Sequence, residues 1–211
     1  MFFNQQIKRF FPPLILLMGP PGSGKGALAR NLPALQHISI GERLRMASLK
    51  DNAQSDAIRH CMEHGKLLAN DIIFNVLSSA PELKTPQAVL LDGFPRTYSQ
   101  WDLLKRKLYM PSAIIDLQVS EPTIHKRLSE RKRMDDKPDI IEKRIEDYFN
   151  NTRPMADTII GENKSIPCCV IDSDDLNPDE VAENVRVFLQ EKDLYPSVIV
   201  NGRNSCRDLT T

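Results

Sequence analysis

Short apolar runs recur along the chain, separated by longer segments with helical spacing. Runs that suit strands lie at Leu14–Met18 (LILLM), Ala88–Asp92 (AVLLD), Ala113–Val119 (AIIDLQV) and Cys168–Asp172 (CCVID), with a shorter candidate at Gln36–Ser39. Such runs are typical of parallel strands that are buried on both faces. Because helical patterns alternate with them, the sequence predicts an α/β fold in three layers, α/β/α, around a parallel five-stranded sheet.

Composition narrows the functions open to the chain. Its 211 residues fit one domain, and the 41% of hydrophobic residues are enough for a core. Lys+Arg and Asp+Glu are both 28, so the net charge is zero and any anion site must be a local cluster. We therefore expect neither nucleic-acid nor membrane binding. Four cysteines without a C-x-x-C pair, and no apolar run near the ~20 residues of a membrane span, predict a cytoplasmic protein.

The two ends of the chain differ from this pattern. Residues 1–13 (MFFNQQIKRFFPP) contain four Phe but neither the apolar core nor the cleavage site of a signal peptide, so we expect an extension that packs on the domain. Residues 191–211 mix Pro, Gly, Asn and Thr and predict a weakly ordered tail. The domain itself is expected to span residues 14–190.

The first strand leads into a phosphate-binding pattern, G-x-x-x-x-G-K, within Leu16–Arg30 (LLMGPPGSGKGALAR). Glycines let successive N–H groups point at one anion, and the following helix adds its positive end. Lys25 supplies a charge for the β- and γ-phosphates. Many such loops follow the lysine with a Ser or Thr that binds Mg²⁺, but here Gly26 follows. We expect magnesium on phosphates and water, with Asp92 as an outer carboxylate at the end of a strand.

Further motifs predict a second phosphorylated substrate. Asp92 opens DGFPRT, a turn from which Arg96 projects, and Gln100 follows four residues later. Upstream, HISIGERLR ends at Arg45, and GKLL occupies Gly65–Leu68. Arginine's planar fork suits phosphate, so two arginines near a phosphate loop indicate a second phosphate site.

Together these motifs resemble those of the adenylate kinases, within the nucleoside monophosphate kinases, from about Leu14 to Leu189. The matching segments are GPPGSGKG, HISIGERLR, GKLL, LLDGFPRTYSQ, RLSERKRMDD and the KR at Lys143–Arg144. In this family glycine follows the lysine, so Gly26 is expected. The resemblance implies the reaction MgATP + AMP ⇌ 2 ADP. A UMP/CMP kinase of the same family and a non-catalytic nucleotide-binding module are the alternatives.

The resemblance also implies roles for individual residues. Those expected to bind ATP are Gly22, Ser23, Gly24, Lys25, Gly26, Ala27, Arg127 and Arg131. Those expected to bind AMP are Ile40, Arg45, Lys66, Leu67, Leu68, Gly93, Phe94, Pro95, Arg96, Gln100, Arg133 and Arg144, with Gln100 reading the base. The catalytic set is Lys25, Arg96, Arg127, Arg131, Arg133 and Arg144. Residues 39–68 would form a mobile monophosphate-binding insertion.

This sequence departs from the family pattern at three positions. The family usually has Thr where this chain has Ala27, which removes one hydroxyl contact but keeps the backbone donors of the loop. It usually has Thr or another small residue in place of Ile40, and Asp more often than Glu42. Ile40 is bulky and its side chain cannot hydrogen-bond, so it bears directly on which base is accepted.

An arginine-rich segment follows the fourth strand. Arg127 and Arg131 lie four residues apart on a helix that Pro122 can start, so we expect them to share a face. Seen alone, such a run is ordinarily a solvated face with salt bridges. The phosphate loop and Arg96 favour instead a role in phosphoryl transfer, where cations stabilise charge and no nucleophilic side chain is needed.

In the family this segment, residues 127–144 here, forms a lid. Only Lys132 separates Arg131 from Arg133, which makes the lid very short. No cysteine lies in it, so no structural zinc is expected. The chain is expected to be a monomer whose partners are small nucleotides.

Overall fold

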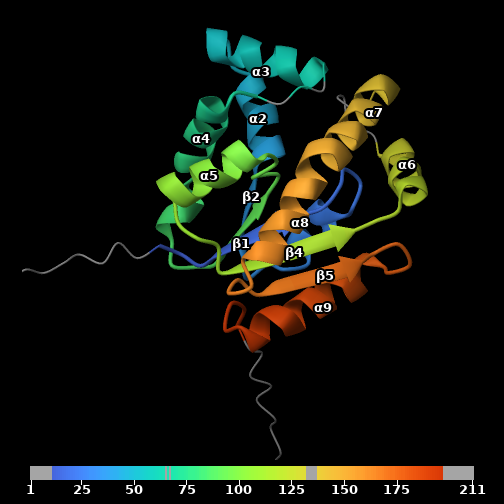
Figure 1. Ribbon diagram of the computed structural model, residues 1–211. Coiled ribbons are helices and arrows are strands. Elements are labelled where there is room, and N and C mark those ends of the chain that lie inside the picture. The colour runs from blue at the N-terminus through green and yellow to red at the C-terminus, as the bar shows by residue number, and fades with distance from the viewer. Residues whose placement is uncertain (1–10, 65, 67, 132–136, 197–211) are drawn as a thin grey trace, which may run out of the picture.

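The centre of the molecule is a parallel sheet (Figure 1). The computed structural model describes residues 11–64, 66, 68–131 and 137–196. The strands are β1 (Leu14–Met18), β2 (Gln36–Ser39), β3 (Val89–Asp92), β4 (Ala113–Gln118) and β5 (Cys168–Asp172). Their order is β2-β3-β1-β4-β5, and every neighbouring pair is parallel. The prediction of a five-stranded parallel sheet is confirmed, including the short candidate strand.

Helices connect the strands. They are α1 (Lys25–Arg30), α2 (Ile40–Ser48), α3 (Ala53–Glu63), α4 (Asn70–Ser78), α5 (Tyr98–Lys107), α6 (Glu121–Glu130), α7 (Pro138–Asp147), α8 (Arg153–Glu162) and α9 (Pro178–Glu191). A short 3₁₀ helix, η1 (Pro81–Lys84), precedes β3, and a π-helical stretch, η2 (Tyr148–Thr152), joins α7 to α8. Within the described residues, none of these helices is both long and apolar enough to cross a membrane.

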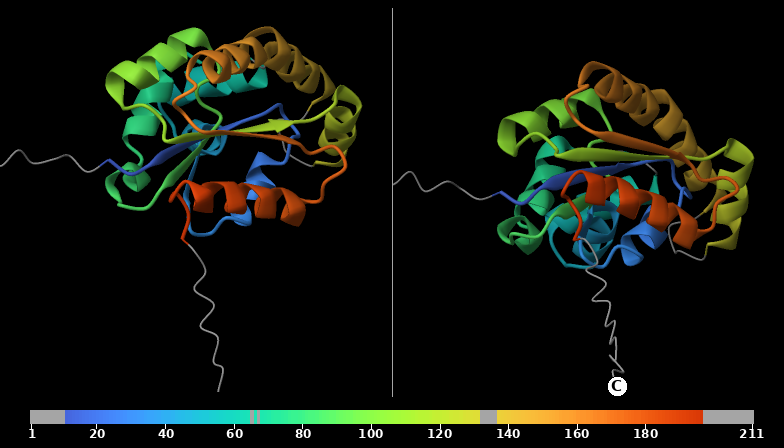
Figure 2. Two further views of the ribbon diagram at one scale, coloured as in Figure 1. Left: turned by 60° about the horizontal axis from the view of Figure 1, so that its bottom comes forward. Right: turned by 90° about the horizontal axis from the view of Figure 1, so that it is seen from below.

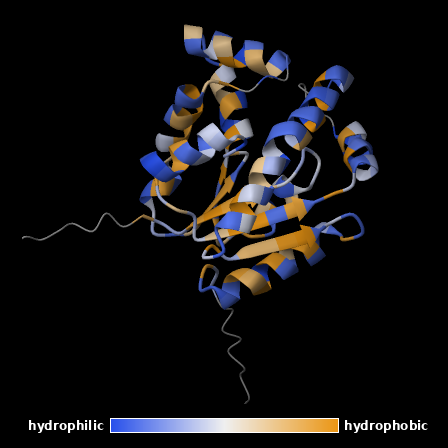
Figure 3. Cartoon of the chain, viewed as in Figure 1, coloured by the Kyte–Doolittle hydropathy of each residue, from blue (hydrophilic) through white to orange (hydrophobic). Residues whose placement is uncertain are grey.

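Helices cover both faces of the sheet, as the edge-on views in Figure 2 show. On one face Leu16 of β1 packs in a cluster with side chains of α2, α4, α5 and α8, among them Trp101. On the other face Leu17 packs with side chains of α1 and α9. Figure 3 shows the apolar strands enclosed by helices whose outer faces are polar. The three layers follow from strands that are apolar on both sides.

The register of the strands places their carboxyl ends at one edge. Asp92, the last residue of β3, lies opposite both Ser39 of β2 and Leu17 of β1. Asp116 of β4 lies opposite Met18, the last residue of β1. In an open parallel sheet, ligands gather at this edge. The phosphate loop, the DGFPRT turn and the end of β4 are therefore neighbours.

The arginine-rich helix ends earlier than predicted. Pro122 does lie in its first turn, but α6 ends at Glu130, and Arg131 adopts extended dihedral angles, φ −82° and ψ 126°. The expectation that Arg127 and Arg131 share a helical face is therefore wrong. Leu128 is the last buried residue of α6, packed with Ile124 and Ile145, and a helix without further packing has little to extend it.

Two smaller features and the ends of the chain complete the fold. Helix α1 is short, since it ends at Arg30 and Pro33 follows soon after. Cys168 and Cys169 are half-buried in the edge strand β5, and burial raises the pKa of the Cys168 thiol to about 11. The expectations for residues 1–10 and 197–211 lie outside the described part of the chain.

The last helix offers a test of the fold. The side chain of Asn177 accepts hydrogen bonds from the backbone N–H groups of Asp179 (2.9 Å) and Glu180 (3.0 Å), and Glu180 accepts one from the N–H of Asn177 (2.8 Å). We expect Asn177→Ala to lower the free energy of unfolding by about 1 kcal/mol, because it removes this cap. Urea denaturation measures the change. Asp175→Ala, an exposed loop substitution nearby, is the control, and equal stability of both variants would contradict the assignment.

Candidate active site

Glycines shape the loop that follows β1. Gly19, Gly22 and Gly24 have positive φ angles of 140°, 81° and 91°. A Cβ atom at Gly19 would lie 2.7 Å from the carbonyl oxygen of Leu117, so the loop packs against β4 more closely than any side chain allows. Gly24 caps the start of α1 in a left-handed conformation. The loop therefore has the backbone that a phosphate-binding turn requires.

Lys25 turns back onto this loop. Its Nζ donates to the carbonyl oxygens of Gly19 (2.8 Å) and Pro20 (2.7 Å) and to the hydroxyl of Ser23 (3.1 Å). The pKa of Lys25 is lowered to about 8, mainly by burial; the charges of Arg96 and Arg131 add to this effect, and those of Asp92 and Asp116 oppose it. The ammonium group is held by weakly competing acceptors that a phosphate can replace.

Asp92 is the carboxylate at the meeting point of the two predicted substrate sites. Burial alone would raise its pKa, but the ring of His37 and the charges of Lys25 and Arg96 outweigh this effect and hold the pKa below its ordinary value. The Nε2 atom of His37 lies 3.8 Å from Oδ2 of Asp92. Asp92 is therefore a carboxylate at neutral pH and accepts hydrogen bonds only.

The DGFPRT turn is fixed by hydrogen bonds from three sides. The Nε of Arg96 donates to the carbonyl oxygen of Gly93 (3.0 Å). Its backbone N–H donates to Oε1 of Gln100 (2.8 Å), and its carbonyl oxygen accepts from the hydroxyl of Thr152 (3.1 Å). Thr97 caps α5 by accepting from the N–H of Gln100 (3.3 Å). The side chain of Gln100 thus holds Arg96 in place, whatever else it binds.

Three predicted phosphate-binding arginines come together here. Burial lowers the pKa of Arg96, the acids Asp92 and Asp147 raise it, and the charges of Arg144 and Arg45 lower it. The two arginines are therefore close enough to Arg96 to repel it. They come from distant parts of the sequence, α2 and α7. Such a cluster is a natural site for a dianionic phosphate.

The other residues that were predicted to bind AMP lie around the DGFPRT turn and before α4. Gly93 lies beside Gly41 and Ile40, since a Cβ at Gly93 would be 3.8 and 3.9 Å from their atoms, and Ile40 is buried. Phe94, Pro95 and Leu68 are buried, whereas Lys66 is exposed.

On the lid side, Arg127 is held by the loop that follows β5. Its guanidinium donates to the carbonyl oxygens of Ser173 (2.6 Å) and Asp174 (3.4 Å) in the loop after β5. Arg131, by contrast, is near enough to Lys25 to affect its pKa. Leu67 and Arg133 lie outside the described residues.

Sequence reasoning missed two groups at this site, His37 and Asp116. His37 is the first residue of the HISIGERLR motif. The sequence offered one indication of its role, a histidine in a short candidate strand, and in the structure this strand ends opposite Asp92. Asp116 is fully buried, with 0% of its surface exposed, and its signal was an acid inside the apolar run AIIDLQV. An acidic side chain is almost never fully buried unless it is paired, so this position called for a partner.

Fold and site together define a class of protein. A phosphate loop with its lysine and an arginine-bearing turn meet at one carboxylate, at the carboxyl edge of a parallel sheet. This arrangement is that of a phosphate-loop nucleoside monophosphate kinase, in which two nucleotides meet for direct phosphoryl transfer.

Comparison with known proteins agrees with this class. A model of the adenylate kinase family matches residues 17–163. An adenylate kinase of Parabacteroides distasonis is 34% identical over 164 residues, 72% of this chain and 86% of that protein. One of Maricaulis maris is 31% identical over 190 residues, 84% of this chain and 99% of that protein. Adenylate kinase isoenzyme 1 of Oryctolagus cuniculus is 30% identical over 151 residues, 67% and 78% of the two chains. The chain belongs to the adenylate kinase family.

The depressed pKa of Lys25 generates a prediction. As pH rises through about 8, the free enzyme loses the ammonium charge, so kcat/KM for ATP should fall on the alkaline side. We expect Lys25→Arg to move this fall beyond the measured range, because arginine stays charged, even if its rate is lower. The measurement is kcat/KM for ATP from pH 6.5 to 9.5 at saturating AMP. A fall at the same pH in both proteins would show that another group titrates.

Proposed function

We propose that this protein transfers the γ-phosphoryl group of MgATP to AMP, reversibly, giving two ADP. The observation that carries the proposal is the convergence of Lys25 and Arg96 on Asp92, which sets the phosphate loop beside the DGFPRT turn. A protein that binds a single nucleotide does not need both the phosphate loop and an arginine-bearing turn beside it. The relatives that match most of this chain bear the name adenylate kinase.

The mechanism assigns positioning and charge stabilisation to the chain's own residues. Lys25 leaves the carbonyl oxygens of the loop and binds the β- and γ-phosphates, while the N–H groups of the loop hold them from below. Arg45, Arg96 and Arg144 hold the phosphate of AMP so that its oxygen faces the γ-phosphorus. Negative charge on the transferring group is stabilised by these cations, so no covalent intermediate on the protein is required.

Magnesium enters with ATP as part of the substrate. The residue after Lys25 is Gly26, so the loop offers no hydroxyl ligand at that position. Asp92 fits the role of an acceptor for the water shell of the ion, because its carboxyl group stays ionised and lies near Lys25. The chemistry that the ion supplies is the neutralisation of phosphate charge.

The choice of base depends on two neighbouring residues. Gln100 uses Oε1 to hold Arg96, and its amide nitrogen is the group proposed to read adenine. Ile40 lies buried beside Gly93 and offers only apolar contact. The test is an assay of ATP turnover with AMP, CMP, UMP or GMP as the acceptor. The proposal predicts the highest kcat/KM for AMP. A preference for UMP or CMP, or no turnover with any acceptor, would contradict it.

A pair of variants separates the two roles of Gln100. In Gln100→Glu a carboxylate oxygen still accepts from the N–H of Arg96, but the amide donor is lost. We expect kcat/KM to fall about tenfold for AMP and much less for the other monophosphates, since a lost hydrogen bond to the base is worth about 1–2 kcal/mol. Arg96→Ala should lower kcat/KM by a similar factor for AMP, CMP, UMP and GMP. Equal losses in both variants would show that Gln100 acts only by holding Arg96.

The short lid generates another prediction. Only Lys132 separates Arg131 from Arg133 in the sequence, so little chain is left to exclude water from the bound nucleotide. We expect phosphate release from ATP without AMP to be a larger share of turnover than in a long-lid relative. A longer loop inserted between the two arginines should reduce that share. An unchanged share would mean that another segment excludes water.

A further inference from the structure

A long helix passes beside the DGFPRT turn. Helices α7 and α8 are joined through η2 and run as one continuous helix (Figure 1). The last residue of η2 is Thr152, which is buried, and its hydroxyl donates to the carbonyl oxygen of Arg96 (3.1 Å). The two residues are 56 positions apart in the sequence. This hydrogen bond therefore connects the predicted monophosphate site to an element from a distant part of the chain.

The direction of this hydrogen bond is unusual for a threonine in a helix. Such a residue commonly donates to a carbonyl oxygen one turn earlier in its own helix. A hydroxyl has a single proton to donate, so the bond from Thr152 to Arg96 takes the place of that local bond. In addition, π-helical stretches such as η2 are rare and occur frequently at functional sites. Both features indicate that Thr152 serves the turn rather than its own helix.

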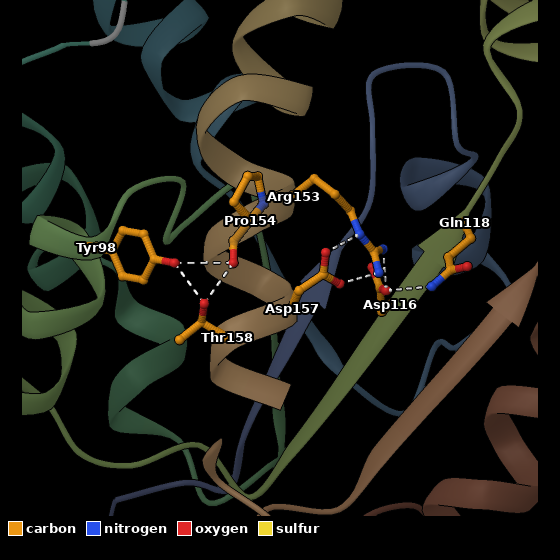
Figure 4. Close-up of polar contacts among 7 residues, drawn as sticks. All are labelled: Tyr98, Asp116, Gln118, Arg153, Pro154, Asp157 and Thr158. Atoms are coloured by element: carbon orange, nitrogen blue, oxygen red, sulfur yellow. Dashed lines mark hydrogen bonds and ion pairs between the residues drawn. The ribbon is translucent and has the colours of Figure 1, made fainter. Parts of the chain in front are cut away.

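The helix is also docked by contacts that do not involve Thr152 (Figure 4). Arg153 donates to Oδ2 of Asp116 in β4 (2.8 Å). The hydroxyl of Tyr98 lies 3.2 Å from the carbonyl oxygen of Pro154 and 2.7 Å from the hydroxyl of Thr158. Apolar side chains of α8 are buried in the core as well. Loss of the Thr152 hydroxyl should therefore leave the helix in place.

The backbone of Arg96 depends on the hydroxyl more directly. Its N–H donates to Oε1 of Gln100 (2.8 Å), and its Nε donates to the carbonyl oxygen of Gly93 (3.0 Å). Both of these bonds are made within the turn and the start of α5, whereas the bond from Thr152 comes from another element. A carbonyl oxygen that loses its partner in a half-buried place turns toward water if it can. Any such shift also moves the guanidinium that is proposed to hold the phosphate.

We propose that Thr152 is a positioning residue for Arg96, and through it for the phosphate of the monophosphate substrate. The hydroxyl of Thr152 touches no substrate. It fixes the carbonyl group of Arg96, while Gln100 fixes the N–H group of the same residue. Every monophosphate carries this phosphate, so the effect is independent of the base. The inference rests on the proposed phosphoryl transfer, because it is measured through that reaction.

The test compares the steady-state kinetics of Thr152→Val and Thr152→Ser with those of the unaltered protein. Valine keeps the branched shape but has no hydroxyl, so the carbonyl oxygen of Arg96 loses its partner. We expect kcat/KM for AMP to fall about fivefold, mainly through a higher KM, since one ordinary hydrogen bond is worth about this factor. Other monophosphates should lose a similar factor, and KM for ATP should not change. Thr152→Ser keeps the hydroxyl and should restore most of the value for AMP.

Thr158→Val is the matched control. It removes another threonine hydroxyl from the same helix, one that contacts Tyr98 rather than Arg96. We expect its KM for AMP to equal that of the unaltered protein, even if thermal unfolding shows a lower Tm. A merely structural role for Thr152 predicts a lower Tm in both valine variants and no change in KM for AMP in either.

A double-mutant cycle with Arg96→Ala shows whether the effect passes through the arginine. Once the guanidinium is absent, Thr152 has no side chain to position, so Thr152→Val should cause little further loss of kcat/KM for AMP. An effect through the general packing of the helix would instead lower kcat/KM by the same factor with and without the guanidinium.

Four results would overturn the inference. These are an unchanged KM for AMP in Thr152→Val, an equal loss in Thr158→Val, no recovery in Thr152→Ser, and a full further loss in the Arg96→Ala background. Failure of Thr152→Val to fold while Thr158→Val folds would make the hydroxyl structural and overturn it too. The proposed function fails separately, because then the unaltered protein itself would not form ADP from ATP and AMP.

Discussion

Mutual repulsion among cations is the constraint on which this active site depends. Phosphoryl transfer needs positive charge from several directions, so Lys25, Arg96 and Arg144 must stay close together even when no phosphate separates them. Burial lowers the pKa values of Lys25 and Arg96, and repulsion from neighbouring arginines acts in the same direction. The parallel sheet makes the arrangement possible, because it brings the ends of β1, β3 and β4 to one edge and holds them rigidly.

The two acidic groups of the central strands have different partners. Asp92 lies at the sheet edge, where the charges of Lys25 and Arg96 help to hold its pKa below the ordinary value. Asp116 is fully buried in β4 and pairs with Arg153 of α8 at 2.8 Å. A carboxylate at the edge neutralises the nearby cations but also repels phosphate, whereas a buried carboxylate that is paired with its own arginine adds little to the field at the substrate site.

Much of this architecture could be predicted from the sequence because its signals are local. The apolar runs that become β1 and β3, the glycines after β1 and the turn at Asp92 each depend on residues within a few positions of one another. The pairing of Asp116 with Arg153 could not be predicted in this way, since the partners are 37 residues apart and meet only when α8 packs on the sheet. Arg131 left its expected helix for a similar reason, because packing ends at Leu128 and helical propensity alone did not extend the element.

The hydrogen bond from the backbone N–H of Arg96 to Gln100 limits how the base preference of such an enzyme can change in evolution. One side chain is proposed to select the base, and the same side chain fixes the arginine proposed to hold the phosphate of every acceptor. A substitution that alters base preference therefore also disturbs a contact common to all substrates. Replacements are limited to residues that still offer an acceptor oxygen at this spot, unless a second mutation supplies one. Divergence toward a new acceptor is easier through neighbours such as Ile40, which shape the pocket without supporting the phosphate.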